Sequence, residues 1–121
     1  MKKEIGRRHY QIGERIRREL SRLFREGRFE HKVSALFSIA EVRMSKGFET
    51  ATVFISALDA GGDEGLVSAL NGIAGEVRYE LAAAASLRTA PALVFKSDAA
   101  PGYAGRIEEL LNSDEVKKDL A

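Results

Sequence analysis

The sequence Asn71-Gly72-Ile73-Ala74-Gly75 (NGIAG) places two glycines three positions apart between two segments of helical character, residues 65–70 and 76–81. Glycine has no Cβ, so a Gly-x-x-Gly joint can bring the backbone close to a phosphate group. Alternatively, the glycines relieve a crowded or left-handed position where two helices meet. The stretch therefore predicts either a phosphate-contacting loop or a kink between two helices.

The segments on either side of this joint alternate between helical and extended patterns. In residues 8–25, isoleucine and leucine recur at the spacing of one helical face. Residues 33–43 and 51–58 are rich in β-forming side chains, and the short connector between them predicts a hairpin. Asp63 or the glycine before it is predicted to cap the following helix. The predicted elements are a helix over 8–25 with Ile12, Ile16, Leu20 and Leu23 on its apolar face, strands over 33–43 and 51–58, helices over 64–71 and 75–87, a strand over 92–96 and a short helix over 103–111.

This order, helix-strand-strand-helix-helix-strand, predicts an α+β fold with a three-stranded sheet and helices packed on one face. The topology is the type II KH-like arrangement, in which a Gly-x-x-Gly loop joins two consecutive helices and clamps a nucleic-acid backbone. Gly72 and Gly75 occupy the position that this topology requires. We expect one domain over residues 1–112 and a polar C-terminal tail over residues 113–121.

Composition excludes several classes of protein. The 121 residues contain no cysteine, so disulfide frameworks, cysteine-bearing zinc sites and thiol catalysis are ruled out. No apolar run approaches the ~20 residues needed to span a bilayer, and no apolar segment of a signal peptide follows the basic start. The sequence therefore predicts a soluble, cytoplasmic protein.

The net charge of +1 conceals a marked asymmetry. Residues 1–32 hold 11 Lys/Arg against five Glu, a charge of +6, whereas residues 33–121 carry −5. Six arginines fall on the helical face opposite the apolar stripe, which indicates a surface for a polyanion; the alternative is a solvated, charge-rich helix. These arginines are Arg7, Arg8, Arg15, Arg18, Arg22 and Arg25.

Several segments, in order and spacing, resemble the bacterial ribosome-binding factor A family over roughly residues 12–120. The most specific is LRTAPALVFKSD at 87–98, similar to the family's Leu-Arg-x-x-Pro-x-Leu-x-Phe-x-x-Asp. The other segments are IRRELS at 16–21, IAEVRMS at 39–45, ATVFIS at 51–56, ALN at 69–71, AGEVR at 74–78 and RIEELL at 106–111.

The resemblance implies a type II KH-like domain that binds the small (30S) ribosomal subunit and its 16S rRNA late in maturation. It further implies support of rRNA processing and cold adaptation, release before translation with a GTPase as the releasing partner, a monomeric state, no cofactor, and no membrane or DNA partner. The family's usual interhelical joint is Ala-x-Gly, which forms a kink. The matching triplet here is Ile73-Ala74-Gly75, so isoleucine replaces the alanine.

The candidate RNA-binding residues are basic. The Gly-x-x-Gly joint has no cation between its glycines and is followed by Glu76, whose carboxylate would repel a phosphate. We therefore favour an interhelical kink formed by Gly72, Ile73, Ala74 and Gly75. The RNA contacts are predicted to come from Arg15, Arg18, Arg22, Arg25, Arg43, Lys46, Arg78 and Arg88.

Other functions receive less support from the sequence. His9 and His31 lack partners at ligand spacing, and no catalytic or metal-binding constellation is predicted, so the protein is not expected to be an enzyme. Phe48 and Tyr103 are interpreted as partly buried aromatics rather than base-stacking platforms. Two alternatives stay open: a generic single-stranded-RNA-binding KH module that acts through Gly72 and Gly75, and a protein-only interaction domain that uses the sheet.

Overall fold

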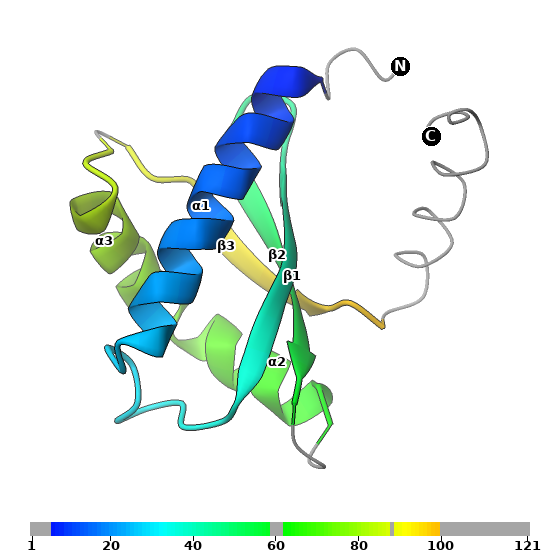
Figure 1. The fold of residues 1–121 in the computed structure, drawn as a ribbon, viewed down its shortest axis with the longest axis vertical. Coiled ribbons are helices and arrows are strands. Elements are labelled where there is room, and N and C mark those ends of the chain that lie inside the picture. Colours follow the sequence, from blue (N-terminus) through cyan, green and yellow to red (C-terminus); the bar gives the residue numbers. More distant parts are fainter. Residues whose placement is uncertain (1–5, 59–61, 88, 100–121) are drawn as a thin grey trace.

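The computed structural model describes residues 6–58, 62–87 and 89–99, which form three helices and a three-stranded sheet (Figure 1). The order helix-strand-strand-helix-helix-strand confirms the predicted α+β, KH-like fold. The predicted helix over 103–111 and the polar tail lie outside the described residues. The elements are α1 (Arg7–Arg25), β1 (Phe37–Met44), β2 (Thr50–Ala57), α2 (Glu64–Gly72), α3 (Ala74–Ala84) and β3 (Ala92–Ser97).

Two predicted boundaries were wrong. The strand expected over 33–43 begins only at Phe37, because Phe37 pairs with Ala57, the last residue of β2. Lys32 and Val33 lie instead in a turn, where their N–H groups donate to the Phe29 carbonyl. The helix expected over 75–87 ends at Ala84, because Ser86 takes a left-handed conformation (φ 55°) that terminates the helix.

The sheet has the strand order β1-β2-β3. β1 and β2 form the predicted antiparallel hairpin, with a bulge between Ile39 and Glu41. β2 and β3 run parallel, with Val53 opposite Phe95. A parallel pair needs a crossover connection, and α2 and α3 supply it.

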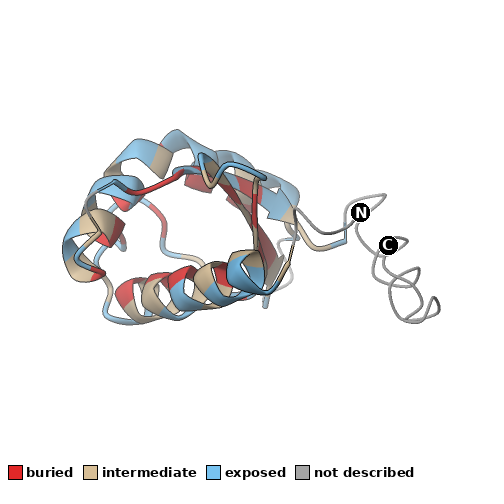
Figure 2. Cartoon of the chain, turned by 90° about the horizontal axis from the view of Figure 1, so that it is seen from above, coloured by how far each residue is buried: buried red, intermediate tan, exposed pale blue. Residues whose placement is uncertain are grey.

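The core lies between the helices and one face of the sheet, where buried residues from both layers meet (Figure 2). On α1, Ile16, Leu20 and Leu23 are at most 2% exposed, which confirms the central part of the predicted apolar stripe. α1 also approaches β1 so closely at Gly13 that an added Cβ would lie 2.4 Å from the carbonyl oxygen of Val42. Only glycine allows that approach, and its role was not predicted.

Polar side chains attach both ends of α2 to the sheet. At its start, Asp63 occupies the N-cap position, as predicted, and its carbonyl accepts from the Val67 N–H at 2.8 Å. Its side chain does not cap the helix; the carboxylate instead accepts from the Ala57 N–H at 2.8 Å and from Ser97 Oγ. At its end, Asn71 Oδ1 accepts from the Phe95 N–H at 2.8 Å, and Asn71 Nδ2 donates to the Phe95 carbonyl at 3.0 Å. The stretch at 71–75 is therefore held against β3 by an asparagine.

Candidate nucleic-acid interface

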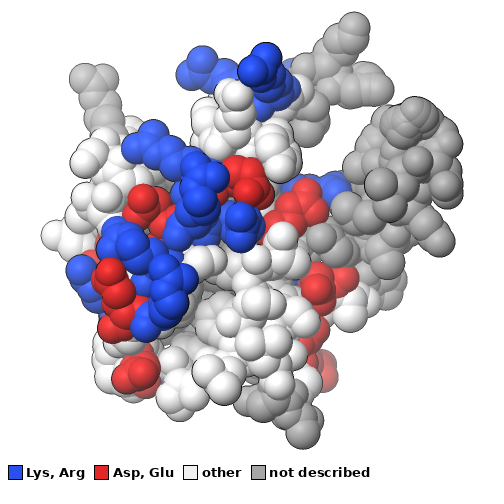
Figure 3. Space-filling view, viewed as in Figure 1, with Lys and Arg blue, Asp and Glu red and all other residues white. Residues whose placement is uncertain are grey.

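The outer face of α1 carries most of the predicted RNA-binding arginines. In Figure 3, basic atoms gather over α1 and are interleaved with acidic atoms. The cations of this face are therefore not equivalent, because some are bonded to carboxylates or carbonyls within the protein and others are not. A phosphate group meets least competition at the unbonded ones.

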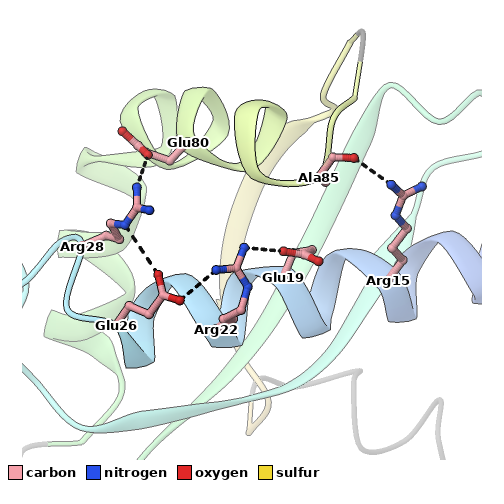
Figure 4. Close-up of polar contacts among 7 residues, drawn as sticks. All are labelled: Arg15, Glu19, Arg22, Glu26, Arg28, Glu80 and Ala85. Atoms are coloured by element: carbon pink, nitrogen blue, oxygen red, sulfur yellow. Dashed lines mark hydrogen bonds and ion pairs between the residues drawn. The ribbon is translucent and has the colours of Figure 1, made fainter.

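Arg22 lies at the centre of an ion-pair network (Figure 4). Its guanidinium donates at 2.8 Å to Glu19 on one side and at 2.8 Å to Glu26 on the other. Hydrogen bonds to Glu19 and then Glu26 raise the pKa of the Arg22 guanidinium. Arg28 extends the network, with its Nε 3.6 Å from Glu26 and its Nη1 2.8 Å from Glu80 on α3 (Figure 4). The charge of Arg22 is thus balanced inside the protein.

Arg15 and Arg78 each donate to a backbone carbonyl. Arg15 Nη2 donates at 2.7 Å to the carbonyl of Ala85, directly after α3 (Figure 4). Arg78 Nε donates at 2.9 Å to the carbonyl of Ala90. A guanidinium has five N–H donors, so both residues keep donors for a further partner.

Arg18, Arg25 and Lys46 are the candidates with exposed, unbonded side chains. Arg18 and Arg25 are exposed on α1, and Lys46 is exposed at the tip of the β1–β2 hairpin. None of the three side chains forms a salt bridge or hydrogen bond within residues 6–58, 62–87 and 89–99. No direct bond to these three side chains therefore competes with an external anion. The Arg18 charge does add, after the hydrogen bond from Arg17, to the lowering of the pKa of the Glu14 carboxyl.

The remaining two predicted cations differ from these. Arg43 is half-buried on β1, where its Nε donates at 2.7 Å to Glu41 and its guanidinium lies 5.9 Å from the centroid of the Phe54 ring. Arg88 lies outside the described residues. The structure thus separates the predicted cations by their partners, which the residue types alone do not reveal.

The joint between α2 and α3 lies where the sequence predicted it. α2 ends at Gly72, α3 begins at Ala74, and the single connecting residue is Ile73 (φ −113°, ψ 15°), whose side chain is 8% exposed. Neither Gly72 nor Gly75 has a left-handed φ, and a Cβ added to either would meet nothing within 4 Å. The proposed reason for the glycines, relief of a crowded or left-handed position, was therefore wrong.

The start of α3 is occupied by an acidic side chain. Glu76 Oε1 lies 3.2 Å from Lys32 Nζ, and its other oxygen lies 3.6 Å from His31 Nε2. No side chain in the described part of the chain caps α3. An external phosphate at this helix end would therefore compete with the Glu76 carboxylate for the nearby cations.

Contacts near the hairpin tip account for Phe48 and His9. The two rings stack with centroids 4.2 Å apart, and His9 Nε2 donates at 2.9 Å to the Lys46 carbonyl. The half-buried Phe48 thus packs inside the protein, as expected, while Tyr103 lies outside the described part of the chain.

No group of three or more metal-ligating side chains occurs among the described residues. No described helix is long and apolar enough to cross a membrane.

Comparison with known proteins places the chain in one family. The sequence model of ribosome-binding factor A matches residues 8–111. Ribosome-binding factor A of Parvibaculum lavamentivorans is 32% identical over 118 residues, which cover 96% of this chain and 84% of the relative.

Two structures of relatives share the fold. The crystal structure of ribosome-binding factor A from Thermus thermophilus is 22% identical, with a TM-score of 0.63 over 76% of this chain and 98% of that one. A homology model of the Thermus thermophilus factor, fitted into the cryo-EM map of its complex with 30S, is 24% identical, with a TM-score of 0.57 over 73% of this chain and 93% of that one. Because the family's sequence pattern extends over most of the chain and the fold is shared, the chain belongs to the ribosome-binding factor A family.

Proposed function

We propose that this protein is a ribosome assembly factor that binds the small (30S) ribosomal subunit through its 16S rRNA. The observation that carries the proposal is the pair of exposed, unbonded arginines on α1, Arg18 and Arg25, in a chain of the ribosome-binding factor A family. The relative from Thermus thermophilus that was fitted into a 30S complex map supports the choice of partner.

The proposed mechanism is electrostatic docking of the α1 face onto rRNA. Arg18, Arg25 and Lys46 neutralise phosphates directly, and Arg15 and Arg78 add contacts through their remaining N–H groups. Arg22 and Arg43 contribute less, because each must first give up a carboxylate partner. Contact with phosphates then stabilises one local RNA conformation.

The biological role extends this binding. A monomer in the cytoplasm would act during late subunit maturation, support rRNA processing and cold adaptation, and leave with a GTPase before translation. The domain of residues 1–112 would hold the RNA contacts without a catalytic step or a cofactor.

Co-sedimentation with 30S subunits at increasing salt tests the proposal. Each phosphate contact that is lost should lower the slope of log affinity against log salt by about 0.7–0.9. We expect Arg18→Gln and Arg25→Gln each to flatten this slope, and the matched Arg28→Gln variant to change it less, because Arg28 is already paired with Glu80 at 2.8 Å. Binding that does not depend on salt, or that survives Arg18→Glu combined with Arg25→Glu, would overturn the proposal.

A second candidate function is a single-stranded-RNA-binding KH module that acts through residues 72–75. The open space around Gly72 and Gly75 favours it, because an external backbone could approach both. The two hydrogen bonds between Asn71 and Phe95 oppose it, because they occupy the side chain next to Gly72 and the N–H and carbonyl of Phe95 on β3, which an RNA strand could otherwise contact.

Replacing both glycines with aspartate separates the two functions. The substitution should not disturb the fold, because a Cβ added at either position has no atom of the described residues within 4 Å. Loss of oligoribonucleotide binding by this folded variant would favour the KH module, whereas unchanged 30S binding would favour docking through α1. A protein-only interaction domain would instead give no RNA crosslinks on assembling subunits.

A further inference from the structure

A pocket of about 520 Å³ opens between the second half of α1, the segment after it and the start of β1. Three phenylalanines line it. The Phe24 ring lies 5.1 Å from that of Phe37 in an edge-on arrangement and 4.9 Å from that of Phe29. Phe29 is buried, whereas Phe24 and Phe37 are half-buried and so leave part of their surface open to the pocket. The pocket thus has an aromatic wall accessible from outside.

The same pocket is lined by polar groups of both signs. Arg25 is exposed and makes no ion pair among the described residues. Ser21, Ser34 and Ser38 contribute hydroxyl groups. Glu30 contributes a carboxylate that has no salt bridge in the described part of the chain. An occupant should therefore combine a flat apolar ring, an anionic group and hydrogen-bonding atoms.

We propose that this pocket binds one unpaired nucleotide of an RNA strand. The base packs against Phe24 and Phe37, and its phosphate pairs with Arg25. Every nucleobase has a π-face that stacks on aromatic side chains, and the volume falls within the ~300–1,000 Å³ typical of small-molecule sites. The proposal rests on the proposed function, because it assigns one nucleotide of the bound rRNA to this pocket.

Charge complementarity decides the occupant. An apolar peptide would leave Arg25 without an anion, whereas a nucleotide supplies a phosphate to the cation and a ring to the phenylalanines. The Glu30 carboxylate accepts hydrogen bonds only, so it favours bases with an exocyclic amino group, namely adenine, guanine and cytosine. Uracil lacks an exocyclic amino group and offers the carboxylate only its ring N3–H.

The pocket also adjoins the α1 face described above. Arg25 belongs to both, since it lies on the basic outer side of α1 and lines the pocket. One RNA strand could therefore pair its backbone with Arg18 and place the next nucleotide at Arg25. The arginine face supplies affinity, and the pocket supplies a preference for an unpaired, amino-bearing base.

Binding of short single-stranded RNA to the full-length chain tests the proposal. We would titrate hexa-adenylate and hexa-uridylate into ¹⁵N-labelled protein and follow the amide signals. We expect hexa-adenylate to shift the signals of residues 34–38, which line the pocket, and to bind several-fold more tightly than hexa-uridylate. Signals that shift only around residues 72–75 would overturn the proposal.

Three variants complete the test. Phe37→Leu keeps apolar bulk but removes an aromatic face, and Arg25→Gln removes the cation; each should weaken hexa-adenylate binding roughly tenfold, as expected for a lost stacking or charged contact. The matched control is Arg28→Gln, because Arg28 is exposed, paired with Glu80 and absent from the pocket lining. Retention of the folded amide spectrum shows that a loss of binding is not a loss of structure.

The outcomes distinguish this proposal from the wider one. If Phe37→Leu and Arg25→Gln bind hexa-adenylate like the parent protein, the pocket proposal is overturned, while 30S co-sedimentation of the parent protein would still support the proposed function. If the parent protein does not sediment with 30S subunits at any salt concentration, the proposed function fails whatever the pocket binds.

Discussion

Replacement of Asn71 should destabilise the protein although the residue is exposed and near a helix end. Its side-chain amide makes two hydrogen bonds to one residue of β3, at 2.8 Å and 3.0 Å. Each bond contributes about 0.5–1.5 kcal/mol, so Asn71→Ala removes about 1–3 kcal/mol. The higher helix propensity of alanine returns about 0.5 kcal/mol, which leaves an expected net loss of about 0.5–2.5 kcal/mol.

Two further variants isolate this effect. Ser68→Ala is the matched control, because Ser68 is exposed on α2, makes no side-chain hydrogen bond among the described residues and gains similar helix propensity. Asn71→Asp keeps an acceptor for the Phe95 N–H but loses the donor, so a carboxylate oxygen faces the Phe95 carbonyl. We expect Asn71→Asp to be less stable than Asn71→Ala at pH 7, because two acceptors then repel each other.

Urea denaturation gives the free energies of unfolding of the variants, and amide hydrogen exchange reports how well the hydrogen bond of one backbone N–H is protected. The Phe95 amide should exchange faster in Asn71→Ala than in the parent protein, because it loses its acceptor. An Asn71→Ala variant that matches Ser68→Ala in both stability and Phe95 exchange would refute the conclusion that Asn71 attaches α2 to β3.

The other predictions concern glycines and one carboxylate. Gly13→Ala should destabilise the protein by about 1–3 kcal/mol in a melting experiment, because its Cβ would collide with the carbonyl of Val42; a stability gain from helix propensity would contradict this. Gly72→Ala and Gly75→Ala should each leave the free energy of unfolding unchanged or raise it by up to about 1 kcal/mol, so the melting temperature should not fall. A clearly lower melting temperature would show that the joint needs glycine. Hydrogen bonds from the Ser97 hydroxyl and the Ala57 N–H lower the pKa of Asp63. The Asp63 carboxylate therefore stabilises the fold fully at a pH above the ordinary carboxyl pKa of about 4, and this stabilisation is lost as the pH falls through the lowered pKa of the folded protein. Urea denaturation between pH 2 and pH 7 should therefore show a smaller loss of stability in acid for Asp63→Asn than for the parent protein.

Local patterns in the sequence were sufficient for the elements and their order. Apolar side chains at helical spacing predicted α1, and β-forming residues around a short glycine-containing connector predicted the β1–β2 hairpin. These patterns are informative because the side chains on one face of a helix or strand recur at a fixed spacing along the chain, and that face is apolar when it is buried. They were less exact at element ends, where the pairing of Phe37 with Ala57 and a left-handed Ser86 set the boundaries.

The candidate interface was predicted only as a set of residue types. The sequence placed six arginines on one helical face, but it treated Arg18 and Arg22 alike. In the structure Arg22 is bonded to two carboxylates, whereas Arg18 has no bonded partner in the described residues. Carboxylates at i−3 and i+4 were a usable signal for Arg22, because side chains at those spacings meet on a helix.

The sequence by itself determined the order of the elements, the apolar face of α1 and the concentration of positive charge in its first 32 residues, because these follow from composition and from short periods along the chain. Only the tertiary structure decided that Gly13 is required by the close approach of β1, that Gly72 and Gly75 are not required by packing, and that Asn71 joins α2 to β3. Each of these facts depends on which atoms meet across two elements that are distant in the sequence. A side chain's type states what it can bond, and the packing of the elements decides which partner lies within reach.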